Sequence, residues 1–184
     1  MGNVAILLDS GYLNNVLKKY YGETRLDYRE FADWVCDKGS LFRVYYYDCL
    51  PYQSANPTPE EAQMISKKQK FLQSLKKIDR FTIRLGRLEY RGHTDDGKPI
   101  FQQKRIDLQI GLDVASLVFN QRVDTIAIVS GDSDLIPAIE LAKNNGIIIR
   151  LVHGPKPTYH QDLWDIADER MEITAQIVEK ISKK

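Results

Sequence analysis

"VDTIAIVSGDSDLIPAIELAKNNGIIIRLV", residues 123–152, decides the fold class, because it holds two apolar runs around a helical pattern. The runs 123–129 and 146–152 are apolar on consecutive rather than alternate residues. Strands buried on both faces have this pattern, and such strands belong to parallel sheets covered by helices. The apolar residues between the runs fall at helical spacing, and Gly146 suits a helix end. The stretch therefore predicts a strand–helix–strand unit with a right-handed crossover.

The remaining sequence fits the same plan, beginning with a third apolar run, "VAILL", at 4–8. "HTDDGK" at 93–98 resembles a hairpin tip with an Asp-Gly turn. Other strands are expected at 41–48, 81–92 and 99–104. Helices are expected at about 10–20, over 27–39 with Asp27 as N-cap, from Thr58 or Pro59 to about Ile78, from about Arg105 to Asn120, and at about 160–182. We therefore expect a single α/β domain over residues 1–184, with a small β-hairpin insertion.

Composition excludes several classes of protein. With 26 basic and 25 acidic residues the net charge is +1, so any affinity for nucleic acid must come from a local patch. No run has the length of a membrane span or the pattern of a secretory signal peptide. Cys36 and Cys49 lack metal-ligand spacing, which favours two reduced thiols in a cytoplasmic protein.

Acidic residues follow the ends of the predicted parallel strands. Asp9 ends the run at the N-terminus, and Asp132 and Asp134 follow the first run of the stretch quoted above. Because functional groups gather beyond the carboxyl ends of such strands, these carboxylates face one crevice if the two strands are neighbours. Asp107, in the first turn of its predicted helix, is placed to point toward the same crevice. Asp113 lies roughly 120° further around that helix, on a different face from Asp107, so we expect it to have only a supporting role.

Such a cluster favours a divalent-metal site, since like charges repel unless protons or cations occupy the site. Mg²⁺ prefers oxygen ligands, and a metal held in this way activates water for attack on a phosphodiester. Each acid also has a structural interpretation. Asp132 alone is as well explained as a helix N-cap, and Asp134 and Asp107 as partners of a helix dipole. Asp9 is harder to explain in this way, because an acid that ends an apolar strand gains nothing from burial.

Three segments resemble the signatures of one family: "AILLDSGYL", "QQKRIDLQIGLDVASL" and "IAIVSGDSDLIPAIELAKNNG". In this order and spacing they are similar to NYN-domain proteins, and more narrowly to the LabA-like branch of the PIN-like nuclease superfamily. The likeness covers nearly the whole chain. "DLWDIADERMEI" resembles the family's closing segment, with its acid at Asp168.

The resemblance implies a Rossmann-like fold in which the strand ending at Asp9 lies beside the strand leading to Asp132. It also implies an Mg²⁺ or Mn²⁺ site and cleavage of RNA. Many members carry Asn three residues after the first-strand acid, where this chain has Tyr12, and this departure changes the polar surroundings of the site. The resemblance assigns catalytic and metal-binding roles to Asp9, Asp107, Asp132 and Asp134, and supporting roles to Ser130 and Lys104.

Basic residues gather between 67 and 105, ahead of the helix that carries Asp107. The lysines of 67–77 are best explained as the solvated face of an amphipathic helix. Tyrosines 45–47 lie on a predicted strand and are expected to pack rather than to bind bases. Contacts to an RNA backbone are expected from Arg84, Arg87, Arg91, Lys104 and Arg105, with Tyr90 available for stacking.

These observations favour a metal-dependent ribonuclease, and two other classes stay open. The second is an RNA-binding or regulatory module with little turnover, which is favoured by Tyr12 in place of the usual Asn. The third, a phosphotransfer domain of the haloacid-dehalogenase or receiver type, ranks low because haloacid phosphatases need Asp-x-Asp after the first strand, where this chain reads "DSG". The expected partner is single-stranded or structured RNA, with no membrane, and the sequence is compatible with a homodimer.

Overall fold

A seven-stranded sheet forms the centre of the computed structural model, which describes residues 2–94, 96–97 and 99–183. The strands are β1 (Asn3–Asp9), β2 (Ser40–Cys49), β3 (Phe81–His93), β4 (Pro99–Lys104), β5 (Thr125–Val129), β6 (Ile148–His153) and β7 (Glu169–Glu172). Their order is β4-β3-β2-β1-β5-β6-β7, and all neighbours are parallel except β3 and β4. The predicted α/β class, with a mostly parallel sheet and a hairpin insertion, is confirmed.

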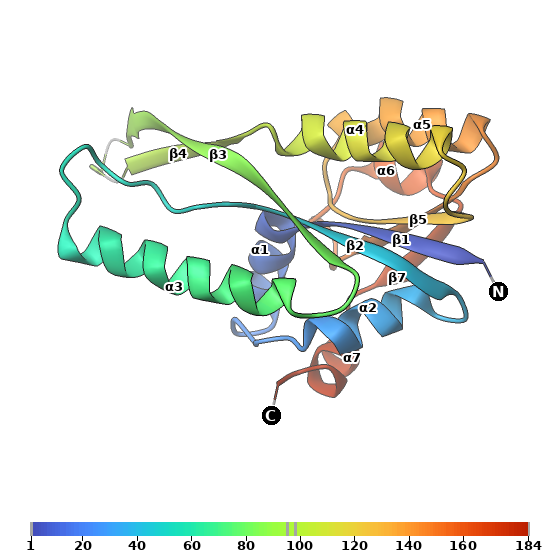
Figure 1. The fold of residues 1–184 in the computed structure, drawn as a ribbon, viewed down its shortest axis with the longest axis horizontal. Helices are drawn as coiled ribbons and strands as arrows, with labels where there is room; N and C mark the ends of the chain where they lie inside the picture. The colour runs from blue at the N-terminus through green and yellow to red at the C-terminus, as the bar shows by residue number, and fades with distance from the viewer. Residues whose placement is uncertain (1, 95, 98, 184) are drawn as a thin grey trace.

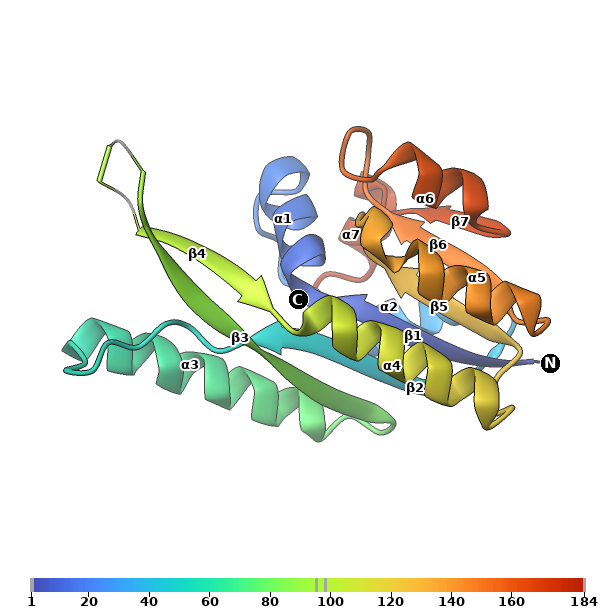
Figure 2. The ribbon, with the colours of Figure 1, turned by 90° about the horizontal axis from the view of Figure 1, so that it is seen from above.

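Helices cover both faces of the sheet and complete a three-layer fold (Figures 1 and 2). They are α1 (Ser10–Tyr20), α2 (Tyr28–Cys36), α3 (Pro59–Lys76), α4 (Ile106–Phe119), α5 (Ile136–Asn144), α6 (Gln161–Ile166) and α7 (Ala175–Lys180), with a 3₁₀ turn, η1 (Ser133–Leu135), before α5. The first three and α7 pack on one face, and α4, α5 and α6 on the other. Among the described helices, none is both long and apolar enough to cross a membrane.

The central strand β1 explains why consecutive residues of its run are apolar. Val4, Ile6 and Leu8 pack in the core beneath α1 and α2, whereas Ala5 and Leu7 pack in the core beneath α4 and α5. All five are at most 2% exposed. The strand lies between β2 and β5, so its two faces and its two edges are all covered.

Helix starts and tyrosine packing follow the sequence predictions. Asp27 caps α2, and Thr58 caps α3 in a reciprocal capping box with Glu61. Each cap satisfies backbone N–H groups that have no partner inside the helix. Tyr46 and Tyr47 of β2 have no exposed surface, which confirms that these two side chains pack in the core.

The hairpin between β3 and β4 turns within the predicted segment. The backbone N–H of Gly97 donates to the carbonyl of Thr94 (2.9 Å), and Gly97 has a φ of +78°, which glycine adopts without strain. Asp95 and Lys98 of the same prediction lie outside the described residues. Figure 2 shows the hairpin extending well beyond the rest of the sheet, so its far end is supported by few neighbouring elements.

The prediction of one C-terminal helix over 160–182 is wrong, because this segment forms α6, the edge strand β7 and then α7. Asp168 breaks the helical pattern: its carboxylate accepts the backbone N–H of Ile149 (2.8 Å) and pairs with Lys143 (2.8 Å). β7 then pairs in parallel with β6. Sheet pairing at the open edge of β6 prevails over local helical spacing.

Gly86→Ala tests how tightly the hairpin joins the sheet. A Cβ on Gly86 would lie 2.6 Å from the Lys104 carbonyl oxygen and 2.7 Å from the Ile106 side chain, so we expect a loss of about 1–3 kcal/mol in unfolding free energy. Gly111→Ala is the matched control, since the space around Gly111 on α4 is open and alanine should add up to about 1 kcal/mol there. Equal stabilities in urea denaturation would contradict the close packing.

Candidate metal centre

Asp9 stands at the end of β1 and caps the first turn of α1. Its Oδ1 accepts the backbone N–H groups of Gly11 (2.8 Å) and Tyr12 (3.2 Å). The acid therefore has a structural use that sequence reasoning did not find. Both hydrogen bonds reach the same oxygen, and Oδ2 accepts none from the described part of the chain. Capping thus leaves Oδ2 available for a second role.

Ser130 and Asp132 come from the loop after β5, the strand that lies in parallel beside β1, as the resemblance implied. Because the two strands are paired to their ends, Asp9 and Ser130 leave the sheet side by side. Asp132 Oδ1 accepts the backbone N–H of Asp134 (2.9 Å) and so caps η1. The buried Ser130 hydroxyl accepts the N–H of Asp132 (3.3 Å). The predicted capping role of Asp132 is confirmed, and it fixes the carboxylate at this edge.

The four predicted acids influence one another electrostatically. Burial raises the pKa of Asp9 to about 6; the two capping N–H groups oppose the rise, and the charges of Asp107 and Asp132 add to it. The pKa of Asp107 is raised by burial and then by the charges of Asp132 and Asp134. Asp107, at the start of α4, therefore links the first-strand acid to the two acids after β5.

The four acids line two different cavities. Asp9 and Asp132 line one of about 570 Å³, whose other walls are the first turn of α1 and the loop 157–160. Asp107 and Asp134 line another of about 340 Å³, between α4 and α5. Asp107, Asp132 and Asp134 are exposed and Asp9 is half-buried, so solvent reaches all four acids.

The donor set suits a hard divalent cation. Carboxylate oxygens are the ligands that Mg²⁺ and Mn²⁺ favour, and a cation offsets both the burial and the mutual repulsion that raise the pKa values of Asp9 and Asp107. Within the part of the chain that the structure describes, no three His, Cys, Asp or Glu side chains are grouped closely enough to hold an ion. The residues thus fit the ion in their chemistry rather than in their present spacing.

Tyr12 anchors the loop that forms the far wall of the larger cavity. Its hydroxyl accepts the backbone N–H of Gly154 (3.0 Å) and shares a hydrogen bond with Thr158 Oγ1 (3.1 Å). The same loop lies directly on Gly131, where any Cβ would overlap the Thr158 carbonyl oxygen. Sequence reasoning identified Tyr12 only as a departure from a family pattern and missed Thr158, since no local pattern marks that residue.

Gln103 of β4 is a second polar neighbour that sequence reasoning missed. A Cβ on Gly11 would lie 3.1 Å from both terminal atoms of the Gln103 side chain and 3.2 Å from Asp9 Oδ1. The Gln103 amide and the Asp9 carboxylate therefore flank the same point at the start of α1. A glutamine in a strand carries no motif, and only the pairing of β4 with β3 brings it to the acids.

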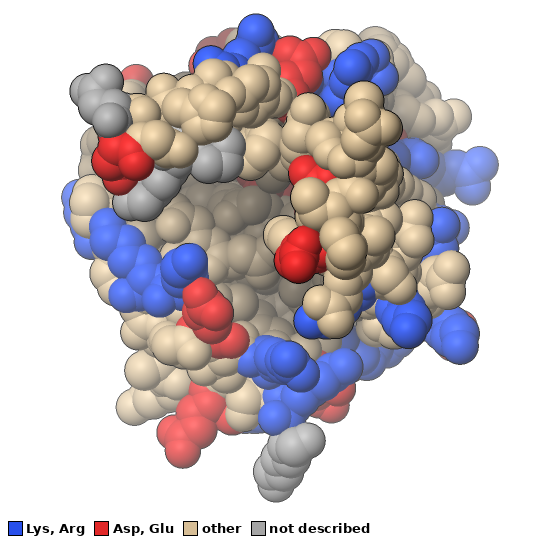
Figure 3. All heavy atoms as spheres, turned by 90° about the vertical axis from the view of Figure 1, so that its left-hand side faces the viewer, with Lys and Arg blue, Asp and Glu red and all other residues tan. Residues whose placement is uncertain are grey.

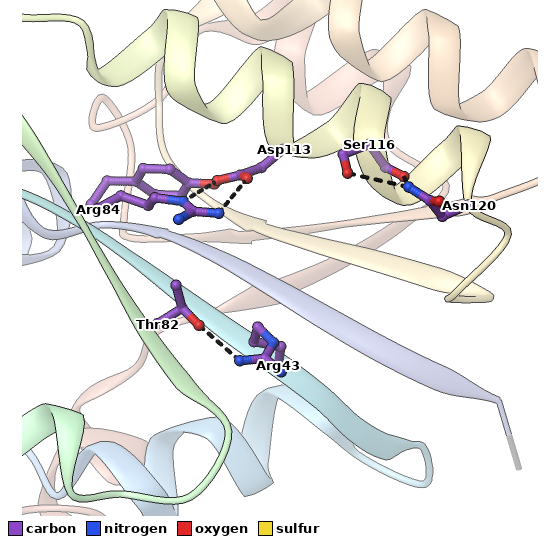
Figure 4. A network of polar contacts seen from close by, with 7 residues as sticks. Arg43, Thr82, Arg84, Asp113, Ser116 and Asn120 are labelled. Carbon is purple, nitrogen blue, oxygen red and sulfur yellow. Dashed lines mark hydrogen bonds and ion pairs between the residues drawn. The ribbon is translucent and has the colours of Figure 1, made fainter.

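Two of the predicted RNA-binding arginines are bound to acids. Arg84 donates to both carboxylate oxygens of Asp113 (3.0 and 2.9 Å; Figure 4), which also accepts the Tyr47 hydroxyl (2.8 Å). Asp113 thus joins β3 and β2 to α4. Arg91 pairs with Glu89 on the same strand (3.0 Å). These ion pairs reduce the capacity of both arginines to bind phosphate.

Comparisons with known proteins add to this geometry. The sequence profile of the NYN domain matches residues 3–173. An uncharacterized protein of Methanocaldococcus jannaschii is 38% identical over 82 residues, which are 43% of this chain and 34% of that protein. The chain therefore covers about a third of that relative's length. A solved structure from Vibrio parahaemolyticus, of a protein of unknown function, is similar over 94% of this chain and 93% of that one, with a TM-score of 0.63 and 21% identity. This likeness supports the fold.

Asp9→Asn tests the electrostatic cost of crowding the acids. Between its unfolded pKa near 4 and its folded pKa of about 6, folded Asp9 keeps a proton that the unfolded chain has released. The wild type therefore loses stability as pH rises from about 4 to 6, and the loss persists above 6. Asparagine caps α1 equally well and does not titrate. At pH 7 we expect the unfolding free energy of the variant to exceed that of the wild type by about 1–2 kcal/mol, a range that allows for the partial exposure of Asp9 to solvent.

Urea denaturation at pH 4 and pH 7 measures this difference. Glu140→Gln, which removes an exposed acid of α5, should leave the pH dependence unchanged. A pH dependence that is the same in Asp9→Asn as in the wild type would show that Asp9 titrates normally in the folded chain.

Tyr12→Phe tests the anchor of the loop. The substitution leaves the buried N–H of Gly154 without its acceptor, so we expect unfolding free energy to fall by about 1–3 kcal/mol. Tyr20→Phe is the matched control on α1, because the Tyr20 hydroxyl makes no hydrogen bond among the described residues. If both variants unfold at the same urea concentration as the wild type, the Tyr12 hydroxyl does not hold the loop.

Proposed function

The chain belongs to the NYN domain family, a PIN-like nuclease family, and on this premise we propose that it is a metal-dependent ribonuclease that hydrolyses RNA phosphodiester bonds. One observation carries the proposal: Asp9 at the end of β1 and Asp132 after the neighbouring strand β5 line one cavity. Asp107, at the start of α4, is near enough for its charge to raise the pKa of Asp9. Stability alone does not favour such crowding, since each carboxylate disfavours the ionisation of the others. The DSGYL and SGDSDL motifs support assignment to the LabA-like branch.

Mg²⁺ or Mn²⁺ is the proposed cofactor, and NYN domain proteins typically use metal ions. Asp9 Oδ2, Asp107 and Asp132 are the proposed ligands, with Asp134 next to Asp107. A bound divalent ion lowers the pKa of water and neutralises charge on phosphoryl oxygens. The chain itself orients the ligands. Backbone N–H groups donate to one oxygen of Asp9 and to one of Asp132, and the Ser130 hydroxyl accepts the N–H of Asp132 within the loop after β5.

Lys104, Arg105 and Arg87 are the residues we propose for binding the RNA backbone. None of them forms an ion pair with an acid in the described part of the chain. Arg105 has a φ of +77°, a conformation that costs a non-glycine residue about 1 kcal/mol or more. Such strain is common where a side chain is held for a function, and Arg105 lies at the start of the helix that carries Asp107.

An RNA-binding module with little turnover is the second candidate. Tyr12 favours it, because this residue occupies the position where many family members carry Asn. Its hydroxyl is committed to Gly154 and Thr158 rather than to the acids. Under this alternative the chain binds RNA with the same basic residues and does not cleave it.

Asp132→Asn tests the proposal while keeping the acceptor that caps η1. The assay follows labelled single-stranded and hairpin RNA with the purified chain in Mn²⁺, Mg²⁺ or EDTA. We expect metal-dependent cleavage that EDTA abolishes and that falls at least about a hundredfold in Asp132→Asn, the effect of losing one group that stabilises a transition state. Asp107→Ala should behave in the same way, and Glu140→Gln should cleave like the wild type.

Cleavage that persists in EDTA, or that is unchanged in Asp132→Asn, would rule out this site. Mn²⁺ binding by calorimetry gives a second readout, which should weaken in Asp132→Asn and Asp107→Ala but not in Glu140→Gln. A wild-type chain that binds RNA without cleaving either substrate would favour the RNA-binding module instead.

A further inference from the structure

Three exposed aromatic rings form a cluster on the hairpin. Tyr90 and Phe101 are cross-strand partners in β3 and β4, and Tyr52, from the segment after β2, packs against both. The ring centroids lie 5.3 to 6.0 Å apart, yet the three residues are 38–42% exposed. A contiguous exposed aromatic surface of this kind is typical of a binding site, whereas single exposed rings are not.

The cluster lies on the face of the hairpin that leads to the acids. Side chains alternate along a strand, so Phe101 and Gln103 share one face of β4, with Tyr90 and Leu88 opposite them on β3. Gln103 is the side chain beside Asp9. The Cα atoms of Phe101 and Gln103 are separated by about 7 Å. A base stacked on the rings would therefore lie close to a phosphate bound through the ion of the proposed metal centre.

The other face of the hairpin carries positive charge without a partner. Arg87 and Lys104 are cross-strand neighbours, an arrangement in which like charges are unfavourable. Neither has an ion-pair partner among the residues described. Figure 3 shows this end of the molecule hollowed, with Lys and Arg side chains along part of the rim. Because these cations and the rings lie on opposite faces of the hairpin, the cations would bind phosphates of nucleotides other than those whose bases stack on the rings.

We propose that Tyr52, Tyr90 and Phe101 form a base-stacking platform for single-stranded RNA. The inference rests on the proposed function and specifies its substrate: unpaired bases offer their faces to aromatic rings, whereas those of a duplex are stacked on one another. The competing explanation is that the rings are only the hairpin's own core, since a two-stranded hairpin is marginally stable by itself. Leucine separates the two uses, because it keeps apolar volume and removes the ring.

The test is RNA binding by fluorescence anisotropy in EDTA, so that cleavage does not enter. The probes are a labelled single-stranded RNA and a matched oligonucleotide of the same phosphate count whose central nucleotides lack bases. We expect the wild type to bind the base-bearing probe about 5- to 100-fold more tightly. Phe101→Leu and Tyr52→Leu should lose most of this preference, whereas Phe101→Tyr should keep it. Ile100→Leu is the control, an exposed residue on the opposite face of β4.

Each outcome decides the platform independently of cleavage. Loss of base preference in the leucine variants, with preference retained in Phe101→Tyr and Ile100→Leu, supports it even if no RNA is hydrolysed. Equal binding of both probes by the wild type, or leucine variants that bind both probes like the wild type, would overturn it. In the last case, metal-dependent cleavage that remains intact would leave the proposed function standing and remove only the platform.

Discussion

The parallel pairing of β1 with β5, enclosed by helices on both faces, is the constraint on which the site depends. Alternate residues of β1 belong to two different cores, so a slip of one residue would exchange the two sets of side chains. Cores are packed too closely to accept that exchange. The register is therefore fixed, and with it the point at which Asp9 and Ser130 leave the sheet.

The acids at that edge are placed by the backbone rather than by one another. Asp9 and Asp132 each give one oxygen to N–H groups of the turn that follows, which holds two like charges in positions that their repulsion disfavours. The local caps offset part of this cost, since a capping carboxylate stabilises a helix start. A capping role and the proposed metal-binding role are thus compatible in the same side chains, because each cap occupies only one carboxylate oxygen.

Much of the fold could be predicted from the sequence, because its strongest signals are local. Apolar runs such as 123–129 indicate strands that are buried on both faces, and Asp27 and Thr58 indicate helix starts. Neither signal depends on distant residues. The segment 160–182 could not be predicted in this way, because Asp168 bonds to Ile149 across the sheet edge.

The residues of the candidate site also differ in whether a local sequence signal marks them. Motifs identified the acids, because these residues follow strand ends directly in the sequence. Gln103 reaches the site only through hairpin pairing, and Tyr12 meets Thr158 across 146 residues of sequence. Contacts of this range depend on the folded arrangement and leave no spacing in the sequence to be found.

The Tyr12 anchor makes position 12 and the loop that it holds interdependent. The phenol fits because Gly131 lacks a side chain, since a Cβ there would meet the Tyr12 ring. Asparagine at position 12 would be too short to reach Gly154 and Thr158, so the loop would lose its anchor and a void would remain where the ring packs. Residues in mutual contact have non-additive effects, so the effect of a substitution at position 12 depends on the loop residues that the side chain meets.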